Sequence, residues 1–220
     1  MKHLKGYIIL IVGTFFMGMG IALTKCSELG VSTISSVPNV LSIRFDFISL
    51  GTWSAIFNVL MILAQMLLLG REFKPSYLLQ IPLSIIFGWF TDFGVWIFAH
   101  IPVTMYLTKL ILSVTGVITL GYGIALTVVS EKVMNPAEAL VKVIADKMNK
   151  DFGNTKIGFD VLFVVMAITF SLIFFNFRII GVREGTIIAM VGTGVCVKFF
   201  TKLLKNKIKT RVVCVDFSKS

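Results

Sequence analysis

The sequence predicts an all-α integral membrane protein with six transmembrane helices, built as two inverted three-helix repeats with a short amphipathic or re-entrant helix after the first helix of each repeat. Three observations lead to this fold class. The 220-residue chain is 56% apolar and only 15% charged, with a mean hydropathy of +0.92, whereas soluble domains carry about a quarter charged residues. Uncharged stretches of spanning length recur along the whole chain, and a motif near residue 20 returns near residue 123.

Six stretches are long and apolar enough to cross the hydrocarbon core, which takes about 20 residues as a helix. The first stretch is not followed by the small-x-small pattern of a signal-peptide cleavage site, so we expect it to be retained as a helix. The 20 Phe residues argue against disorder. The expected helices cover residues 6–24, 51–70, 77–99, 107–129, 157–177 and 184–203.

Basic residues predict the orientation of these helices, because cytoplasmic loops retain Lys and Arg. With the N-terminus inside, 15 of the 21 Lys and Arg residues fall on the cytoplasmic side, four fall outside and two lie within the spans. We therefore expect a multi-pass protein of the cell inner membrane with both termini in the cytoplasm. The expected divisions are a first repeat at 1–105, a second at 106–204 and a basic cytoplasmic tail at 205–220.

An internal repeat is the strongest signal in the chain. Residues 18–28 (GMGIALTKCSE) and 121–131 (GYGIALTVVSE) are identical at eight of 11 positions. Because each repeat holds three spans, an odd number, the second must enter the membrane from the opposite side, as in many secondary transporters. The repeat pairs Glu28 with Glu131 just beyond helix ends, where they could line entrances on opposite faces or only be solvated.

A polar linker follows the first span of each repeat. In the first repeat it is rich in hydroxyls, and in the second Asn135, Pro136 and Glu138 resemble a capped helix start, with the helix running to about Met148. Each linker could be a re-entrant half-helix that marks a site or an amphipathic helix on the membrane surface, and five lysines favour the surface for the second. The candidate substrate-binding residues are Ser32, Thr33, Ser35, Ser36, Asn39 and Asp92.

Charged residues inside the spans need partners, because a charge at the bilayer centre is costly. Equal distances from the intervening turn predict two polar pairs, Asn58 with Asp92 and Asp160 with Lys198. Each pair could simply clamp two helices. Alternatively, a carboxylate could couple transport to an ion, and Asp92 is the best candidate because its expected partner is neutral.

Two function classes remain after composition and motifs are considered. No catalytic constellation, metal cluster or cofactor motif is recognisable, so we expect no enzyme, no metal and no cofactor. The net charge of +10 is explained by the membrane rather than by nucleic acid. We expect either a transporter or exporter of an unknown small molecule, or a non-transporting regulator or assembly protein whose cytoplasmic basic face binds lipid or a soluble partner. Beyond the lipid bilayer, neither the partner nor the oligomeric state follows from the sequence.

Six segments carry a resemblance to a known family. They are ISSVPNVLS (34–42), GTWSAIFN (51–58), QIPLSIIFGWFTDF (80–93), MNPAEALVK (134–142), FGNTKIGFDV (152–161) and VREGTIIA (182–189). Together they resemble the YczE/YyaS/YitT-type family of bacterial integral membrane proteins over about residues 5–205. The resemblance implies a small multi-spanning protein of the bacterial inner membrane, in a family for which export or transport of small molecules has been suggested. It carries over no catalytic residues.

Overall fold

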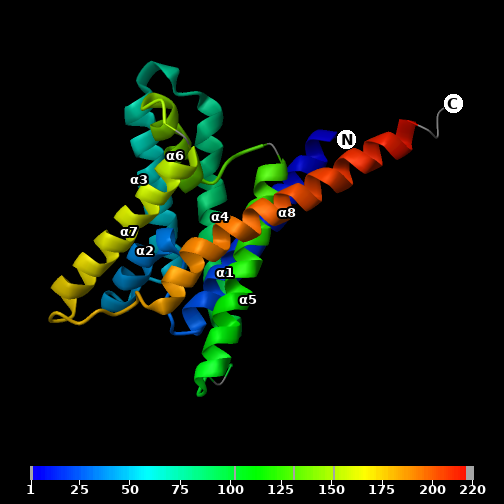
Figure 1. The fold of residues 1–220 in the computed structure, drawn as a ribbon. Coiled ribbons are helices and arrows are strands. Elements are labelled where there is room, and N and C mark those ends of the chain that lie inside the picture. The colour runs from blue at the N-terminus through cyan, green and yellow to red at the C-terminus, as the bar shows by residue number, and fades with distance from the viewer. Residues whose placement is uncertain (1, 102, 131, 151, 217–220) are drawn as a thin grey trace.

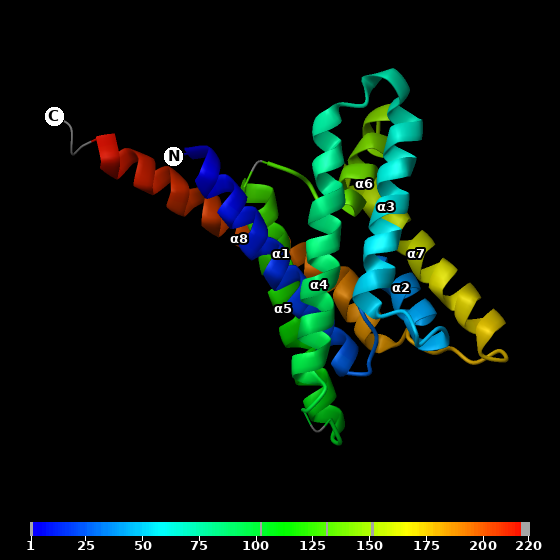
Figure 2. The ribbon, with the colours of Figure 1, turned by 180° about the vertical axis from the view of Figure 1, so that it is seen from behind.

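The structure is a computed structural model that describes residues 2–101, 103–130, 132–150 and 152–216. Within these ranges the regular structure is helical throughout, as Figures 1 and 2 show from two sides. The helices are α1 (Lys2–Cys26), α2 (Thr33–Arg44), α3 (Leu50–Leu69), α4 (Gln80–Phe98), α5 (Tyr106–Ser130), α6 (Pro136–Lys147), α7 (Phe152–Phe174) and α8 (Glu184–Asp216), with the 3₁₀ turns η1 (Gly70–Glu72) and η2 (Pro75–Leu79) between α3 and α4.

Among the described residues, six helices are long and apolar enough to cross a membrane, and they match the six expected spans. These segments are Lys5–Cys26, Leu50–Glu72, Pro75–Phe98, Tyr106–Ser130, Asn154–Phe174 and Glu184–Lys205. The chain is therefore described as a multi-pass membrane protein. Figure 1 places the start of α1, the end of α8 and the α3–α4 connection at one end of the molecule, and the α4–α5 connection at the other.

The order of helices repeats along the chain. One long helix, one short helix and two long helices (α1 to α4) are followed by the same order in α5 to α8. The helix ends repeat as well, because Thr24 Oγ1 donates to the Ile21 carbonyl in the same way that Thr127 Oγ1 donates to the Ile124 carbonyl. The sequence repeat thus corresponds to a repeat of structural elements.

Helices α1 and α5 cross antiparallel at the centre of the molecule through glycines. A Cβ atom on Gly13 would lie 2.9 Å from the Gly123 carbonyl oxygen, and one on Gly20 would lie 2.8 Å from the Gly116 carbonyl oxygen. Only glycine allows such close backbone approach, which is how helices associate where lipid supplies no hydrophobic drive. In the sequence repeat, Gly13 corresponds to Gly116 and Gly20 corresponds to Gly123. Exchanging the two repeats therefore converts one of these contacts into the other.

Packing between the other helices follows the same exchange, with two exceptions. Helix α1 packs on α4 as α5 packs on α8, α2 packs on α7 as α6 packs on α3, and α2 packs on α3 as α6 packs on α7. The first exception is that α3 packs closely on α4, whereas α8 lies mainly against α5 and diverges from α7 (Figure 1). The second is that α2 also contacts α8, without a comparable contact of α6 with α4. Each short helix therefore lies between a helix of its own half and a helix of the other half.

One apolar cluster joins the two halves around the short helices. It combines Val37 and Val40 of α2, Val141 of α6 and Phe163 of α7 with Met61 of α3. Helix α6 is buried on more than one side, since Ala139 and Val143 are enclosed as well as Val141. The packing around α6 thus differs from that expected of a helix lying with one face on a surface.

Candidate functional site

A polar centre forms where the first residue of α2 meets α7. Thr33 Oγ1 donates a hydrogen bond of 2.8 Å to Asp160 Oδ1, and Lys156 Nζ forms an ion pair of 2.7 Å with the same oxygen. Lys156 and Asp160 are spaced i, i+4 on α7, so the helix places both on one face. Asp160 is 7% exposed, and a carboxylate buried to this extent needs the charge and the hydroxyl that it contacts.

Glu138, in the first turn of α6, adds a second carboxylate to this polar centre. Its Oε2 atom is enclosed and accepts no hydrogen bond. Burial raises the pKa of Glu138, while Lys156 and an Asn135 hydrogen bond oppose the rise and Asp160 adds to it. Lys156 is therefore in an ion pair with Asp160 and attracts the Glu138 carboxylate at longer range.

The start of α6 agrees only in part with the expected cap. Pro136 occupies the first turn as expected, and Asn135 is the residue that precedes the helix. The Asn135 side chain makes no capping hydrogen bond to the backbone of α6. Its interaction with Glu138 instead belongs to the polar centre.

The hydroxyl groups of α2 are buried, and most are satisfied within the protein. Ser32 Oγ donates to Ser35 Oγ over 3.1 Å, and Ser36 Oγ donates to the Thr33 carbonyl over 2.5 Å. Asn39 Nδ2 donates to the Gly181 carbonyl over 3.2 Å, but Asn39 Oδ1 is buried without a partner. Of the candidate substrate contacts on α2, Thr33 therefore reaches the polar centre and Asn39 keeps an unused acceptor.

Two cavities lie at opposite ends of the molecule. The α1-end cavity has a volume of about 610 Å³ and is lined by the end of α1, by α2 and by the α7–α8 connection, with Lys25, Asn39 and Arg183 among its residues. The α5-end cavity has a volume of about 400 Å³ and is lined by the chain after α5, by α6 and by the α3–α4 connection. The two cavities thus use corresponding elements of the two halves.

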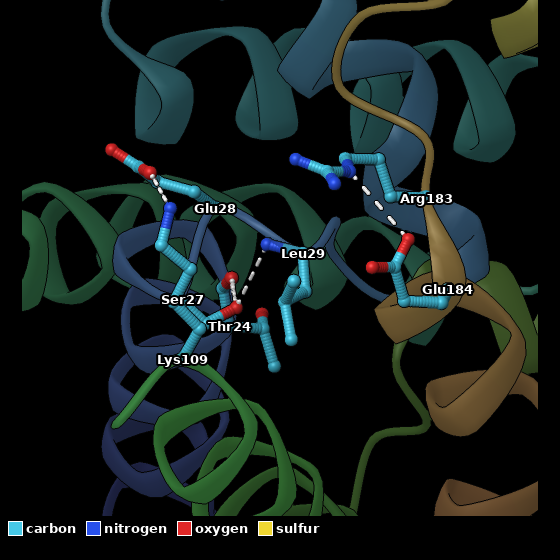
Figure 3. A network of polar contacts seen from close by, with 7 residues as sticks. All are labelled: Thr24, Ser27, Glu28, Leu29, Lys109, Arg183 and Glu184. Atoms are coloured by element: carbon cyan, nitrogen blue, oxygen red, sulfur yellow. Dashed lines mark hydrogen bonds and ion pairs between the residues drawn. The ribbon is translucent and has the colours of Figure 1, made fainter. Parts of the chain in front are cut away.

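Polar contacts hold the rim of the α1-end cavity (Figure 3). Glu28 forms an ion pair of 2.5 Å with Lys109, and Arg183 Nε lies 3.5 Å from Glu184 Oε2. Ser27 Oγ donates to the Thr24 carbonyl and accepts from the Leu29 N–H. In the α5-end cavity, the buried amides of Gln65 and Gln80 bond to each other at 3.2 and 3.4 Å.

Asp92 does not pair with Asn58. Its Oδ1 accepts from the Gly51 N–H at 2.7 Å and its Oδ2 accepts from Ser49 Oγ at 2.5 Å, so both oxygens serve the first turn of α3. The expectation centred the turn near residue 75, but the Gly51–Asp92 contact is centred between residues 71 and 72, so Asp92 reaches seven residues beyond Asn58 toward the start of α3. Asn58 faces the start of α6, beside Asn135.

The expected pair of Asp160 with Lys198 is not formed either. Asp160 contacts Lys156 and Thr33, whereas Lys198 is exposed on α8. The equal-depth argument assumed that the fifth and sixth spans are neighbours, but α8 packs on α5. Glu28 lies on the rim described above, and Glu131, its repeat counterpart, lies outside the described residues.

The sequence interpretation missed two residues. Lys156 could have been found from its i, i+4 spacing to Asp160, which is typical of an ion pair on one helix face. Lys25 ends the first span, and its Nζ donates to Ser42 Oγ at 3.0 Å. Within the described ranges, no three His, Cys, Asp or Glu side chains lie close enough together to hold a metal ion.

Comparison with known proteins supports part of the expected resemblance. The chain is 26% identical over 166 residues to the uncharacterized protein YyaS of Bacillus subtilis, covering 73% of this chain and 78% of that protein. The relation to YczE and YitT stays a prediction. No solved structure matches the chain. The model of a family of unknown function, DUF6198, matches residues 4–202, so the chain belongs to this family.

Proposed function

We propose that the protein transports a small solute by alternating access between two halves related by an inverted repeat. The antiparallel crossing of α1 and α5 supports the inverted repeat, because two antiparallel helices are exchanged by a two-fold axis perpendicular to them. For helices that span the membrane, this axis lies in the membrane plane, as in many secondary transporters. We further propose that both termini are cytoplasmic in the inner membrane, as the distribution of Lys and Arg indicates.

We propose that α2 and α6 are re-entrant half-helices. Thr33 contacts Asp160, which lies eight residues after the start of α7, about 12 Å along that helix. The Pro136 carbonyl accepts from Gln65 Nε2 at 3.1 Å, and Lys147 reaches the Leu68 carbonyl, so α6 runs beside the last third of α3. Polar backbone at such depth is tolerated where it lines a cavity or is buried in protein.

The observation that carries the proposal is the polar centre, to which the first turns of both short helices contribute. Half-helix N-termini direct their positive dipole ends toward substrates or carboxylates in transporters of this architecture. Lys156 pairs with Asp160 and attracts the buried Glu138, whose pKa burial raises, so a change in the protonation of Glu138 alters the charge between the two halves. We therefore assign proton coupling to Glu138, and to Asp92 the role of capping α3.

The test is flux in proteoliposomes loaded with a pH-sensitive dye. A panel of amino acids, carboxylic acids, amines and sugars is added with and without an imposed proton gradient. Wild-type protein should change the internal pH with at least one solute class, Glu138→Gln should lose the gradient dependence, and Lys198→Met should behave as wild type. Absence of flux for the whole panel under both conditions would overturn the proposal.

A regulatory function is the second candidate, and the shape of α8 favours it. The end of α8 projects away from the other helices in Figure 1, and its sequence there is rich in Lys. Such a segment binds anionic lipid or an acidic partner. Removing residues 206–220 should leave transport unchanged under the first proposal and should abolish binding to phosphatidylserine vesicles under the second.

A further inference from the structure

The α1-end cavity has the size and lining of a small-molecule site. Its volume of about 610 Å³ falls within the range of ligand pockets, about 300 to 1,000 Å³. Slightly more than half of its wall is apolar, and polar groups form the rest. The apolar lining includes Val31, Ile43, Val95, Phe98, Ile101 and Ile180.

The available charge in this cavity is positive. Glu28 is an acidic residue of the cavity lining, and it forms an ion pair with Lys109, which is not part of the lining. Lys25 donates to the hydroxyl of Ser42, which is neutral, and within the described residues no carboxylate lies at ion-pair distance from it. An ammonium group has three donors, so Lys25 can donate to a further acceptor from the cavity.

Asn39 lines the same cavity and carries an acceptor without a partner. Asn39 is 4% exposed, and its Nδ2 donates to the Gly181 carbonyl. This hydrogen bond fixes the orientation of the side-chain amide, because a carbonyl oxygen cannot donate to Oδ1. Oδ1 accepts no hydrogen bond. A buried acceptor without a partner is unfavourable, so a donor from a ligand would satisfy it.

We propose that the α1-end cavity binds a small organic carboxylate that has an apolar body and a neutral hydrogen-bond donor, such as a 2-hydroxy acid. The carboxylate would lie on Lys25, the donor would face Asn39 Oδ1, and the apolar body would contact the wall near Ile43 and Phe98. A neutral donor suits the site better than an ammonium group, because Lys25 repels a second cation. The inference rests on the proposed transport function and gives its substrate class.

The test compares three probes with the same aromatic body. Mandelate carries both a carboxylate and a hydroxyl, phenylacetate lacks the hydroxyl, and phenethylamine has the opposite charge. Binding is measured by calorimetry on the full chain in phosphatidylcholine nanodiscs, with empty nanodiscs as the blank. Mandelate should bind about five- to tenfold more tightly than phenylacetate, the ratio expected for one neutral hydrogen bond, and phenethylamine should not bind.

Variants test the two residues separately. Asn39→Ala should make mandelate and phenylacetate equal, Lys25→Gln should remove the preference for acid over amine, and Lys205→Gln, outside the cavity, should change nothing. Because the comparison is a ratio within one variant, a loss of folded protein does not imitate the result. Equal affinity of the three probes for the wild type, or binding of none, would overturn the inference.

Two further outcomes separate this inference from the transport proposal. Binding of mandelate without flux of any solute would retain the carboxylate site and overturn transport. Flux of other solutes without binding of either acid would retain transport and overturn the carboxylate site. Added phosphatidylglycerol should not displace mandelate, and displacement would assign the cavity to lipid phosphate instead.

Discussion

Replacing Asp160 by asparagine should destabilise the folded protein by about 3 kcal/mol. Asparagine can still accept from Thr33, but the ion pair of 2.7 Å with Lys156 is lost. Breaking a buried pair costs about 3 to 5 kcal/mol, because the remaining charge is unpaired. The lower end applies here, since the Lys156 side chain is 25% exposed.

A double-mutant cycle separates this pair from other effects of the substitutions. Lys156→Met should also cost about 3 kcal/mol, since it leaves the Asp160 carboxylate with Thr33 alone. The double variant should lose about 3 kcal/mol in total rather than about 6, which corresponds to a coupling energy of about 3 kcal/mol. Unfolding is followed by tryptophan fluorescence in mixed micelles of dodecyl maltoside and dodecyl sulfate.

Lys198→Met is the matched control for the cycle. Lys198 is exposed on α8, so its substitution should change the free energy of unfolding by no more than about 0.5 kcal/mol. Additive effects of the two single variants would refute the assigned pair. So would a Lys198→Met variant as unstable as Lys156→Met.

Three further predictions concern other elements. Burial raises the pKa of Glu138 above 4.5, so the folded state binds more protons than the unfolded state. The stability of the protein should therefore fall as the pH rises above about 4.5. The Glu138→Gln variant should match the wild type near pH 4 and should melt at a higher temperature than the wild type at pH 8. Gly20→Val should lower the free energy of unfolding by about 2 to 3 kcal/mol, since a Cβ at this position would lie 2.5 Å from the Leu120 nitrogen. Gly194 has open space around it, so Gly194→Val should be nearly neutral in the same micelle assay. Asp92→Ala should lower stability by about 1 kcal/mol through loss of the α3 cap, and a loss of proton coupling without loss of stability would instead support a transport role for Asp92.

Local patterns predicted the spans well because hydropathy over about 20 residues depends on no other part of the chain. Pro136 likewise marked the start of α6, since its fixed backbone angle suits a first turn. The partners of Asp92, Asp160 and Lys198 could not be predicted in this way. They depend on which helices are neighbours, and neither the register of α4 against α3 nor the divergence of α8 from α7 leaves a periodic signal in the sequence.

The site was predicted in part for the same reason. The hydroxyls of α2 were recognisable as unusual for an apolar linker, and the structure buries them. Their partners were not recognisable, because the Phe163 carbonyl that accepts from Ser36 over 3.4 Å lies 127 residues away along the chain. Lys156 was a local signal, and its spacing to Asp160 would have indicated the pair that the structure contains.

The interlocking of the short helices has a consequence for biosynthesis. Helix α2 packs on α7, which leaves the ribosome only after α3 to α6 have been made, whereas α6 finds α3 already inserted. Until α7 arrives, the Thr33 hydroxyl lacks the Asp160 carboxylate to which it donates. The first half of the chain therefore completes its folding late, and a nascent chain that ends before α7 would present an unfinished surface to membrane chaperones and proteases.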